Sequence, residues 1–203
     1  LLPMLDEIVK MTELDLKTID AIAVAKGPGS FTGLRIGSAT AKGLGLALDK
    51  PLVGIPTVEA LAYNLYDVNG LICPIMDARR KQVYTGIYRY EDHRLVTVKD
   101  QMAVGIEELL SMLNEMGESV TFLGDGVPVF KDIIADKLEV PFSFAPAHLS
   151  RQRAGAVGAL GVLYYKEGRT ETAAEHKPDY LRVSQAERER VQKLKKESEG
   201  ENA

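Results

Sequence analysis

The glycine-rich segment GPGSFTG, residues 27 to 33, has the residue types that could do the most specific chemistry in this sequence. It follows a short apolar run and opens a helical pattern, so backbone N–H groups and the positive end of a helix dipole would suit an anion such as phosphate. However, no lysine follows Gly33, where a Walker loop has one, and Thr32 occupies the third glycine position of a dinucleotide fingerprint. A tight strand-to-helix connection with Thr32 as N-cap explains the same residues. The residues alone favour this structural role and leave phosphate contact open.

Two other polar loops follow predicted strands, where side chains of α/β proteins often line a cleft. One contains Asp77, Arg79 and Arg80, and the other contains Gly124 and Asp125. Asp-Gly is also ordinary turn chemistry, and paired arginines are common on surfaces, so a structural role is favoured here too. The residues that we predict as candidates for contact with a nucleotide or another anion are Gly27, Gly29, Ser30, Thr32, Arg35, Asp77, Gly124 and Asp125.

Catalytic and metal-binding patterns are sparse. The histidines are His93, His148 and His176, and none belongs to an HxxxH or HExxH pair that could hold a metal ion. We expect each of them to have a surface or capping role. Cys73 is the only cysteine, which excludes an internal disulfide and a cysteine-rich zinc site and fits a reducing cytoplasm. Ser30 lies in no GxSxG elbow, so we predict no catalytic residue and no metal site.

Small residues recur at every fourth position of the helix predicted from about residue 32 to residue 48. They form two stripes, namely Gly33, Gly37, Ala41 and Gly45, and beside them Ala39, Gly43 and Ala47. Each interior glycine weakens a helix by roughly 1 kcal/mol relative to alanine, so close packing must offset this cost. Small residues allow another backbone to approach closely. Either the helix packs closely on its own sheet, or one stripe meets the sheet and the other meets a second protein chain.

The elements that must position these residues follow from hydrophobic periodicity. Residues 1 to 12 predict an amphipathic helix, and strands at 21–27 and 52–55 flank the small-residue helix. After Gly70, three strand candidates follow at hairpin spacing, and helices then alternate with strands up to about residue 166. This order predicts an α/β layer architecture. We divide the chain into an N-terminal subdomain (1–68), a C-terminal subdomain (69–184) and a charged helical or disordered tail (185–203).

Composition limits the classes of function. With 45% hydrophobic and 27% charged residues in 203, the chain has the make-up of an ordinary globular protein. Its net charge of -4 gives no global positive field for nucleic acid. No apolar run approaches the roughly 20 residues that span a bilayer, so we expect no membrane contact. The sequence starts at Leu1, already inside a helical pattern, and we expect native N-terminal residues to be missing.

A family resemblance rests on specific segments. The run AIAVAKGPGSFTGLRIGSATAKGLGLALDKPLVGIPTVEALA closely resembles the TsaB (YeaZ-like) family, and the resemblance continues through MDARRKQVYTGIY, FLGDG and PDYLR. It covers most of residues 1 to 182. It implies an α/β, actin-like ATPase fold of two ribonuclease-H-like subdomains, with mixed sheets flanked by helices. It also implies a non-catalytic, cytoplasmic scaffold subunit of the bacterial machinery that makes threonylcarbamoyladenosine in tRNA.

The same resemblance implies partners. They are a catalytic TsaD-type subunit, a TsaE-type ATPase, a second copy of the chain in isolation, and tRNA only through the complex. The expected interface lies on the helices at 1–12 and 32–48, with Leu1, Leu5, Ile8, Gly33, Gly37, Ala41 and Gly45 as its residues. No cofactor is expected on the chain alone, whereas ATP or ADP could bind at the interface of the complex.

Two alternatives stay open. A self-contained actin-like ATPase or sugar kinase would need acidic metal-positioning residues on a first strand that this sequence does not contain. A glycoprotease-like hydrolase would need metal ligands that the sequence does not show. Family members usually open with a β-hairpin bearing an Asp-Thr-Ser motif, and its absence here supports the expectation that N-terminal residues are missing.

Overall fold

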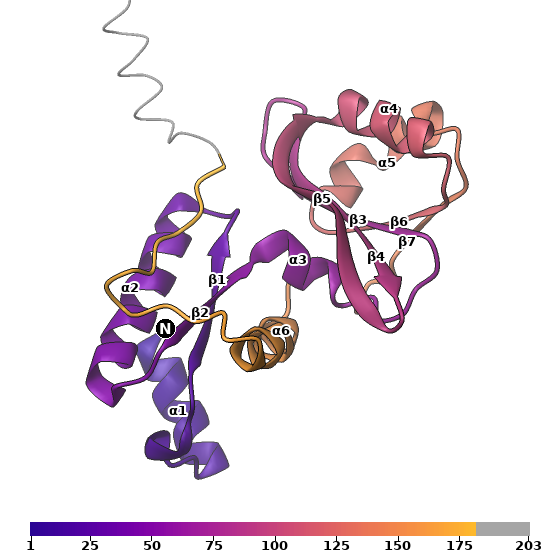
Figure 1. Ribbon diagram of the computed structural model, residues 1–203. Coiled ribbons are helices and arrows are strands. Elements are labelled where there is room, and N and C mark those ends of the chain that lie inside the picture. Colours follow the sequence, from indigo (N-terminus) through magenta and orange to yellow (C-terminus); the bar gives the residue numbers. More distant parts are fainter. Residues whose placement is uncertain (182–203) are drawn as a thin grey trace, which may run out of the picture.

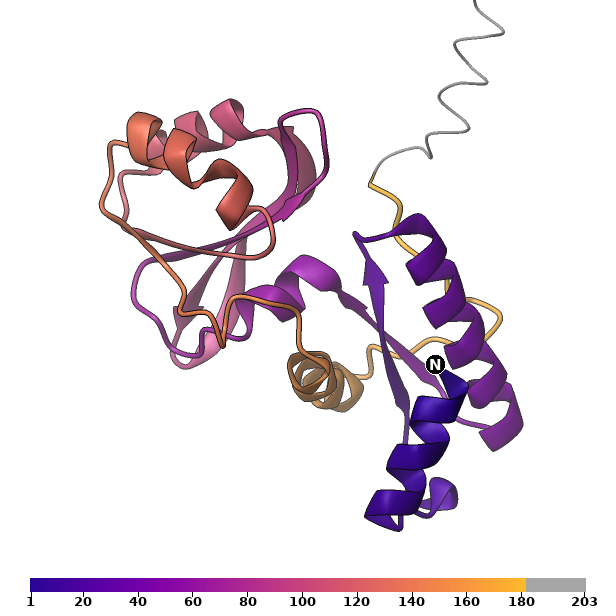
Figure 2. The same ribbon diagram turned by 180° about the vertical axis from the view of Figure 1, so that it is seen from behind.

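Two sheets, one of two strands and one of five, form the centres of two lobes in the computed structural model, which describes residues 1–181 (Figure 1). The smaller sheet pairs two parallel strands, β1 (Ile22–Gly27) and β2 (Leu52–Pro56). The elements around it are α1 (Leu2–Thr12), the short 3-10 turn η1 (Leu16–Thr18), α2 (Phe31–Leu48) and α6 (Ala154–Lys166). Both side views place α2 on one side of this sheet and α6 on the other (Figure 2).

The larger sheet has the strand order β5-β4-β3-β6-β7. Its strands are β3 (Leu71–Asp77), β4 (Gln82–Glu91), β5 (Arg94–Gly105), β6 (Val120–Leu123) and β7 (Phe142–Phe144). β4 runs antiparallel to both of its neighbours, whereas β3, β6 and β7 run parallel to one another. Successive side chains of a strand point to opposite faces, so two layers of helices can cover this sheet. One layer is α4 (Ile106–Met116) with α5 (Val127–Lys137), and the other is α3 (Thr57–Ala62).

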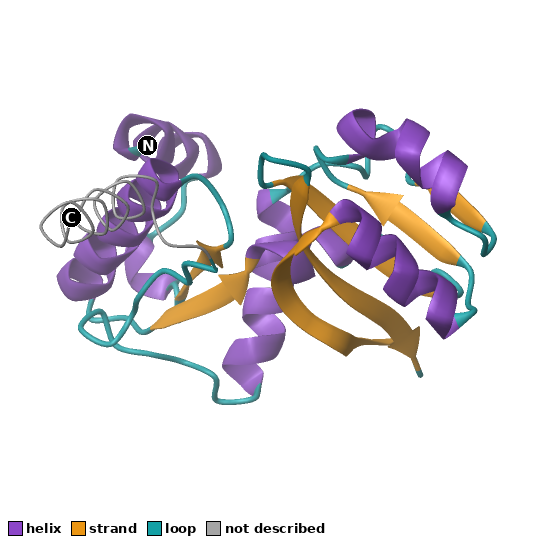
Figure 3. Cartoon of the chain, turned by 90° about the horizontal axis from the view of Figure 1, so that it is seen from above, coloured by secondary structure: helices purple, strands orange, loops and turns teal. Residues whose placement is uncertain are grey.

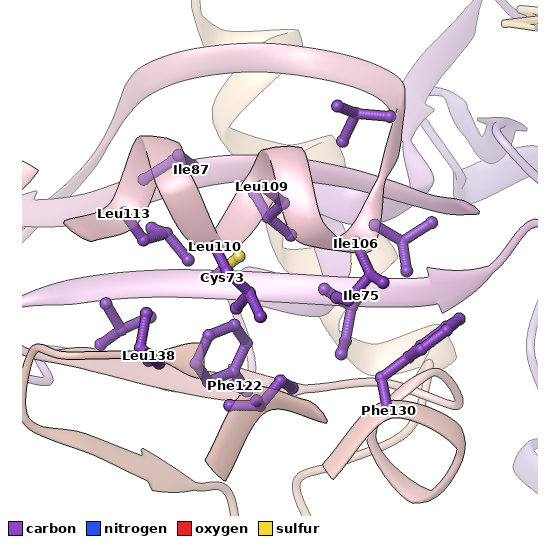
Figure 4. Close-up of a cluster of buried hydrophobic side chains, with 14 of the residues drawn as sticks. Cys73, Ile75, Ile87, Ile106, Leu109, Leu110, Leu113, Phe122, Phe130 and Leu138 are labelled. Carbon is purple, nitrogen blue, oxygen red and sulfur yellow. The ribbon is translucent and has the colours of Figure 1, made fainter. Parts of the chain in front are cut away.

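The main core lies between the five-stranded sheet and the layer of α4 and α5 (Figure 4). Ile106, Leu109, Leu110 and Leu113 recur at the spacing of one helical face and are all buried. They pack against strand residues that include Cys73. Burial raises the pKa of the Cys73 thiol to about 12, so this thiol stays protonated and unreactive.

Two helices cross between the lobes. α3 follows β2 along the chain, yet Val58 and Leu61 pack against Ile72 of the five-stranded sheet. α6 follows β7, yet Leu160 packs against Val53 of the two-stranded sheet. Each lobe therefore contributes one helix that packs on the sheet of the other lobe. Figure 3 shows the two lobes side by side.

The predicted helices and strands are all present in the described residues, with ends that differ by a few residues, such as the start of α6 at Ala154 rather than near 151. The packing of α6 on the two-stranded sheet differs from the expectation, because sequence order places this helix in the C-terminal subdomain. Glu171 and Leu52 also exchange two backbone hydrogen bonds of 2.8 and 2.9 Å, which returns the chain to the smaller sheet. The subdomain limits stay predictions, and the tail predicted at 185–203 lies outside the described residues. None of the described helices is long and apolar enough to cross a bilayer.

Candidate functional site

The glycine-rich loop connects β1 to α2, and its serine caps the helix. The Ser30 Oγ accepts a hydrogen bond from the Gly33 N–H at 3.3 Å, and the helix begins at Phe31. Our expectation that Thr32 is the N-cap is therefore wrong, because Thr32 already lies inside the first helical turn. The cap leaves fewer free N–H groups at the helix start for an anion.

The C-terminal end of the described chain covers this loop. The Asp179 N–H donates to the Lys26 carbonyl at 2.6 Å, and a Cβ on Gly27, whose φ is +123°, would collide with the Asp179 carbonyl oxygen. The rings of Phe31 and Tyr180 lie 5.0 Å apart, and the Arg35 guanidinium lies 4.1 Å from the Phe31 ring centroid. These contacts support the structural role of the loop. Anion contact by this segment stays a prediction.

The second group of predicted contacts lies at the carboxyl ends of β3 and β6. The Asp77 carboxylate accepts from the Arg79 backbone N–H at 2.8 Å and pairs with the Arg79 guanidinium at 3.2 Å. The Gly124 N–H donates to the Ser150 carbonyl at 3.0 Å, so it is not free for an anion. One Asp125 carboxylate oxygen is buried without a hydrogen-bond partner in the described residues.

The two groups belong to different sheets. Gly27, Gly29, Ser30, Thr32 and Arg35 lie at the end of β1, whereas the others lie at the ends of β3 and β6. A cavity of about 880 Å³, described below, lies between the lobes, and none of the eight predicted residues lines it. Within residues 1–181, no group of three His, Cys, Asp or Glu side chains gathers as metal ligands would.

The histidines differ in environment. His148 is exposed, and His93 is exposed and lies 2.7 Å from an Asp67 carboxylate oxygen. His176, in contrast, is fully buried, with Nδ1 2.7 Å from a Glu171 carboxylate oxygen. We expected a surface or capping role for each histidine, and the full burial of His176 contradicts the surface role, because its ring lies beneath the surface against Glu171 of the same segment.

The small-residue helix α2 has one face on the sheet and one face in solvent. Ala41 and Gly45 are buried, and a Cβ on Gly45 would lie 3.0 Å from the Lys50 carbonyl oxygen and 3.1 Å from the Leu52 side chain. These two residues cannot contact a partner, which corrects their place in the predicted interface. Gly37 and Gly43 have no atom within 4 Å of an added Cβ. The first stripe is therefore divided, with Ala41 and Gly45 on the chain's own sheet and Gly33 and Gly37 open, whereas the neighbouring stripe of Ala39, Gly43 and Ala47 is exposed.

One arc of α2, on the side opposite the sheet, carries no charged residue, and the exposed Arg35 lies just outside this arc. At 100° per residue, its members fall within one arc opposite the sheet. They are Thr32, Ile36, Ala39, Thr40, Gly43, Leu46 and Ala47. Ile36 is 55% exposed and Leu46 is 75% exposed. Surface helices ordinarily place charged residues on the side that faces water, so an exposed arc without charge is unusual.

Helix α1 adds further exposed apolar side chains, since none of its residues is buried. Leu1, Met4, Ile8 and Met11 are all more than half exposed. Between α1, α2 and β1 lies an apolar groove of about 480 Å³. We call the exposed apolar residues of both helices the α1–α2 surface, defined by Leu1, Leu2, Met4, Ile8, Met11, Ile36, Gly43 and Leu46.

A matched pair of substitutions tests the two faces of α2. We expect Ala41→Leu to lower the free energy of unfolding by about 1–3 kcal/mol, because the larger side chain overfills the contact with the sheet. The same change at the exposed Ala39 should alter it by less than about 0.5 kcal/mol. Thermal melts followed by circular dichroism measure both, and equal melting temperatures would contradict the assignment of the faces.

A cavity of about 880 Å³ lies between the lobes, and sequence reasoning missed the residues that form it. Glu59 on α3 meets Tyr164 on α6 at its floor, and the Tyr164 hydroxyl donates to both carboxylate oxygens at 2.6 and 2.7 Å. Asp179 accepts from Gln101 of β5 and pairs with Lys26 of β1, both at 3.3 Å. These partners are up to 105 residues apart, so no local pattern could reveal them.

Two lobes that exchange a helix across a central cavity, one of them with a ribonuclease-H-like sheet, define an actin-like α/β protein. A solved structure supports this class, namely YeaZ from Pseudomonas aeruginosa, which superposes with a TM-score of 0.73 at 22% identity. The match covers 89% of this chain and 82% of that chain.

Sequence comparisons are more specific. The family model described as TsaD, tRNA N6-adenosine threonylcarbamoyltransferase, matches residues 1–190. The tRNA threonylcarbamoyladenosine biosynthesis protein TsaB of Bacillus subtilis is 36% identical over 194 residues, which are 96% of this chain and 83% of that protein. The TsaB protein of Escherichia coli is 33% identical over 137 residues, 66% of this chain and 59% of that protein. The chain belongs to the family that the TsaD model describes and, within it, to the TsaB (YeaZ-like) proteins.

Proposed function

We propose that this chain is the non-catalytic scaffold subunit of the machinery that makes threonylcarbamoyladenosine in tRNA. In this role it binds the catalytic TsaD-type subunit, supports a TsaE-type ATPase and pairs with a second copy of itself in isolation. The names of the curated relatives supply the reaction. The observation that supports the scaffold role is the exposed apolar α1–α2 surface.

This surface has the properties of the centre of a protein–protein interface. Such centres are poor in charged residues and rich in large apolar side chains, here supplied by Leu2, Met4, Ile36 and Leu46. Gly43 adds a position at which a partner backbone can approach closely. The same surface can pair with a second copy when the catalytic subunit is absent, because pairing buries apolar side chains that would otherwise be exposed to water.

The remaining parts of the proposal follow from charge and from the loops. A chain of net charge -4 neutralises few phosphates, so tRNA is held through the complex. The Gly124 N–H and the cap of α2 are engaged within the chain, which supports binding of ATP or ADP only where the partner completes a site. The unpaired Cys73 fits the reducing cytoplasm as the place of action.

The purified chain alone should neither hydrolyse ATP at a useful rate nor transfer threonylcarbamoyl to tRNA. Phosphate release and nucleoside analysis of the tRNA measure the two activities, and a mixture with the TsaD-type subunit is the positive control. Turnover by the chain alone would contradict the scaffold role. To exclude activity from a co-purifying partner, the measurement is repeated with active-site substitutions in that partner, and turnover must persist.

A further inference from the structure

The cavity between the lobes has a size and a lining that suit a small ligand. Its volume of about 880 Å³ lies within the range of small-molecule sites. Side chains from α3, α6 and the strands of both sheets reach it. Tyr63, Tyr88 and Tyr164 contribute aromatic rings, and Leu160 contributes an apolar wall.

Glu59 stands out among the charged residues of this cavity. Its carboxylate is partly buried and accepts hydrogen bonds from the Tyr164 hydroxyl, but within residues 1–181 no basic nitrogen lies within salt-bridge distance of it. Burial raises the pKa of the Glu59 carboxyl, and the Tyr164 hydrogen bond and the more distant charges of Arg169 and Lys26 offset this only in part. A carboxylate withdrawn from water without a paired cation is costly.

The basic residues nearest to Glu59 already have partners. Lys26 lies 3.3 Å from an Asp179 carboxylate oxygen, and Arg169 lies 3.6 Å from a Glu167 carboxylate oxygen. The Arg169 guanidinium also stacks on the Tyr164 ring, 3.2 Å from its centroid. Glu59 is therefore a partly buried acidic residue of the cavity whose charge has no ion-pair partner among the described residues.

We propose that this cavity binds a small molecule through a primary ammonium group that pairs with Glu59. An ammonium group offers three N–H donors, which match the two carboxylate oxygens with one donor to spare. The faces of the surrounding tyrosine rings attract a cation further. Arg94 and Lys166 also line the cavity and form no ion pair with the described residues, so an anionic end on the same molecule has partners as well.

Calorimetric titration of the full chain tests the proposal with three probes. Spermidine carries ammonium groups alone, L-leucine carries an ammonium group and a carboxylate, and N-acetyl-L-leucine lacks the ammonium group. We expect at least one of the first two to bind at concentrations up to roughly 10 mM and the third not to bind. Binding of leucine alone shows that the anionic end contributes, and binding of spermidine shows that the ammonium group suffices. Binding of neither overturns the proposal.

Three variants locate the site. Glu59→Gln removes the charge but keeps an oxygen that accepts from the Tyr164 hydroxyl, so we expect the fold to persist and affinity to fall at least about tenfold. Asp100→Asn removes an exposed charge from the same cavity and should leave affinity within about threefold. Tyr164→Phe retains the carboxylate and should still bind, which provides a test if the Glu59 variant does not fold. Unchanged affinity in Glu59→Gln, or loss of binding in Tyr164→Phe with the fold intact, contradicts the assignment.

Discussion

Replacing Ile36 and Leu46 together by aspartate should weaken binding of the TsaD-type subunit by more than about 100-fold while leaving the chain folded. Both side chains lie on the uncharged arc of α2 and are 55% and 75% exposed, so their replacement costs the isolated chain little. In a complex, two carboxylates would have to leave water for an apolar surface, which is costly without cationic partners. Titration calorimetry with the catalytic subunit measures the affinity.

Val129→Asp is the matched control for this experiment. Val129 is 58% exposed, but it lies on α5 of the other lobe, away from the α1–α2 surface. We expect its affinity for the catalytic subunit to equal that of the unchanged chain. If the double variant bound as tightly as the control, the α1–α2 surface would not be the interface.

Gly124→Val should destabilise the chain by about 2–6 kcal/mol, the sum of backbone strain and overpacking of about 1–3 kcal/mol each. Gly124 has φ of +109°, which residues with a side chain rarely adopt. A Cβ there would collide with the Ile75 carbonyl oxygen and lie 3.1 Å from the Leu61 side chain. Because domains are stable by only about 5–15 kcal/mol, guanidinium unfolding should show a large fall in midpoint.

Gly117→Ala separates the two causes. Gly117 also has a positive φ, +68°, but an added Cβ there meets nothing within 4 Å. Its replacement should therefore cost only the backbone term, roughly 1–2 kcal/mol. Equal midpoints for the two variants would show that the contact between Gly124 and Ile75 does not restrict this loop.

Local patterns were enough to predict the elements of the fold. The spacing of Ile106, Leu109, Leu110 and Leu113 identified both the helix and the face that it buries. The alternation of apolar strands with hairpin-length gaps identified β3, β4 and β5 in order. In these segments, the side chains that define the periodicity are the same ones that fill the core, so the pattern and the packing carry the same information.

Which face of the small-residue helix packs on the sheet could not be predicted in this way. Both stripes share the spacing of four, and the sheet-facing one is identified only by Leu52 and Lys50, which approach Gly45 after the chain has turned back. The sequence therefore left two alternatives open, namely close packing of the whole helix on its own sheet or one stripe on the sheet and one on a partner. Ala41 and Gly45 of the predicted interface are buried within the chain.

Contacts between residues far apart in the sequence could not be predicted from local patterns either. Nothing in the apolar sequence of α6 tells which sheet it covers, because its hydrophobic residues run all round the helix. His176 was expected to have a surface or capping role, because a lone histidine has no local partner signal. Glu59 was not among the predicted site residues, since its partner Tyr164 lies 105 residues away.

The central claim is most directly tested by reconstituting tRNA modification with and without this chain. The TsaD-type and TsaE-type proteins of the same cell would be combined with tRNA, ATP and the threonylcarbamoyl donor, and threonylcarbamoyladenosine would be quantified by mass spectrometry of the nucleosides. The scaffold account predicts that modification requires this chain in stoichiometric complex with the catalytic subunit and that the chain alone gives none. Equal modification when the chain is omitted, with no complex detected on mixing, would contradict it.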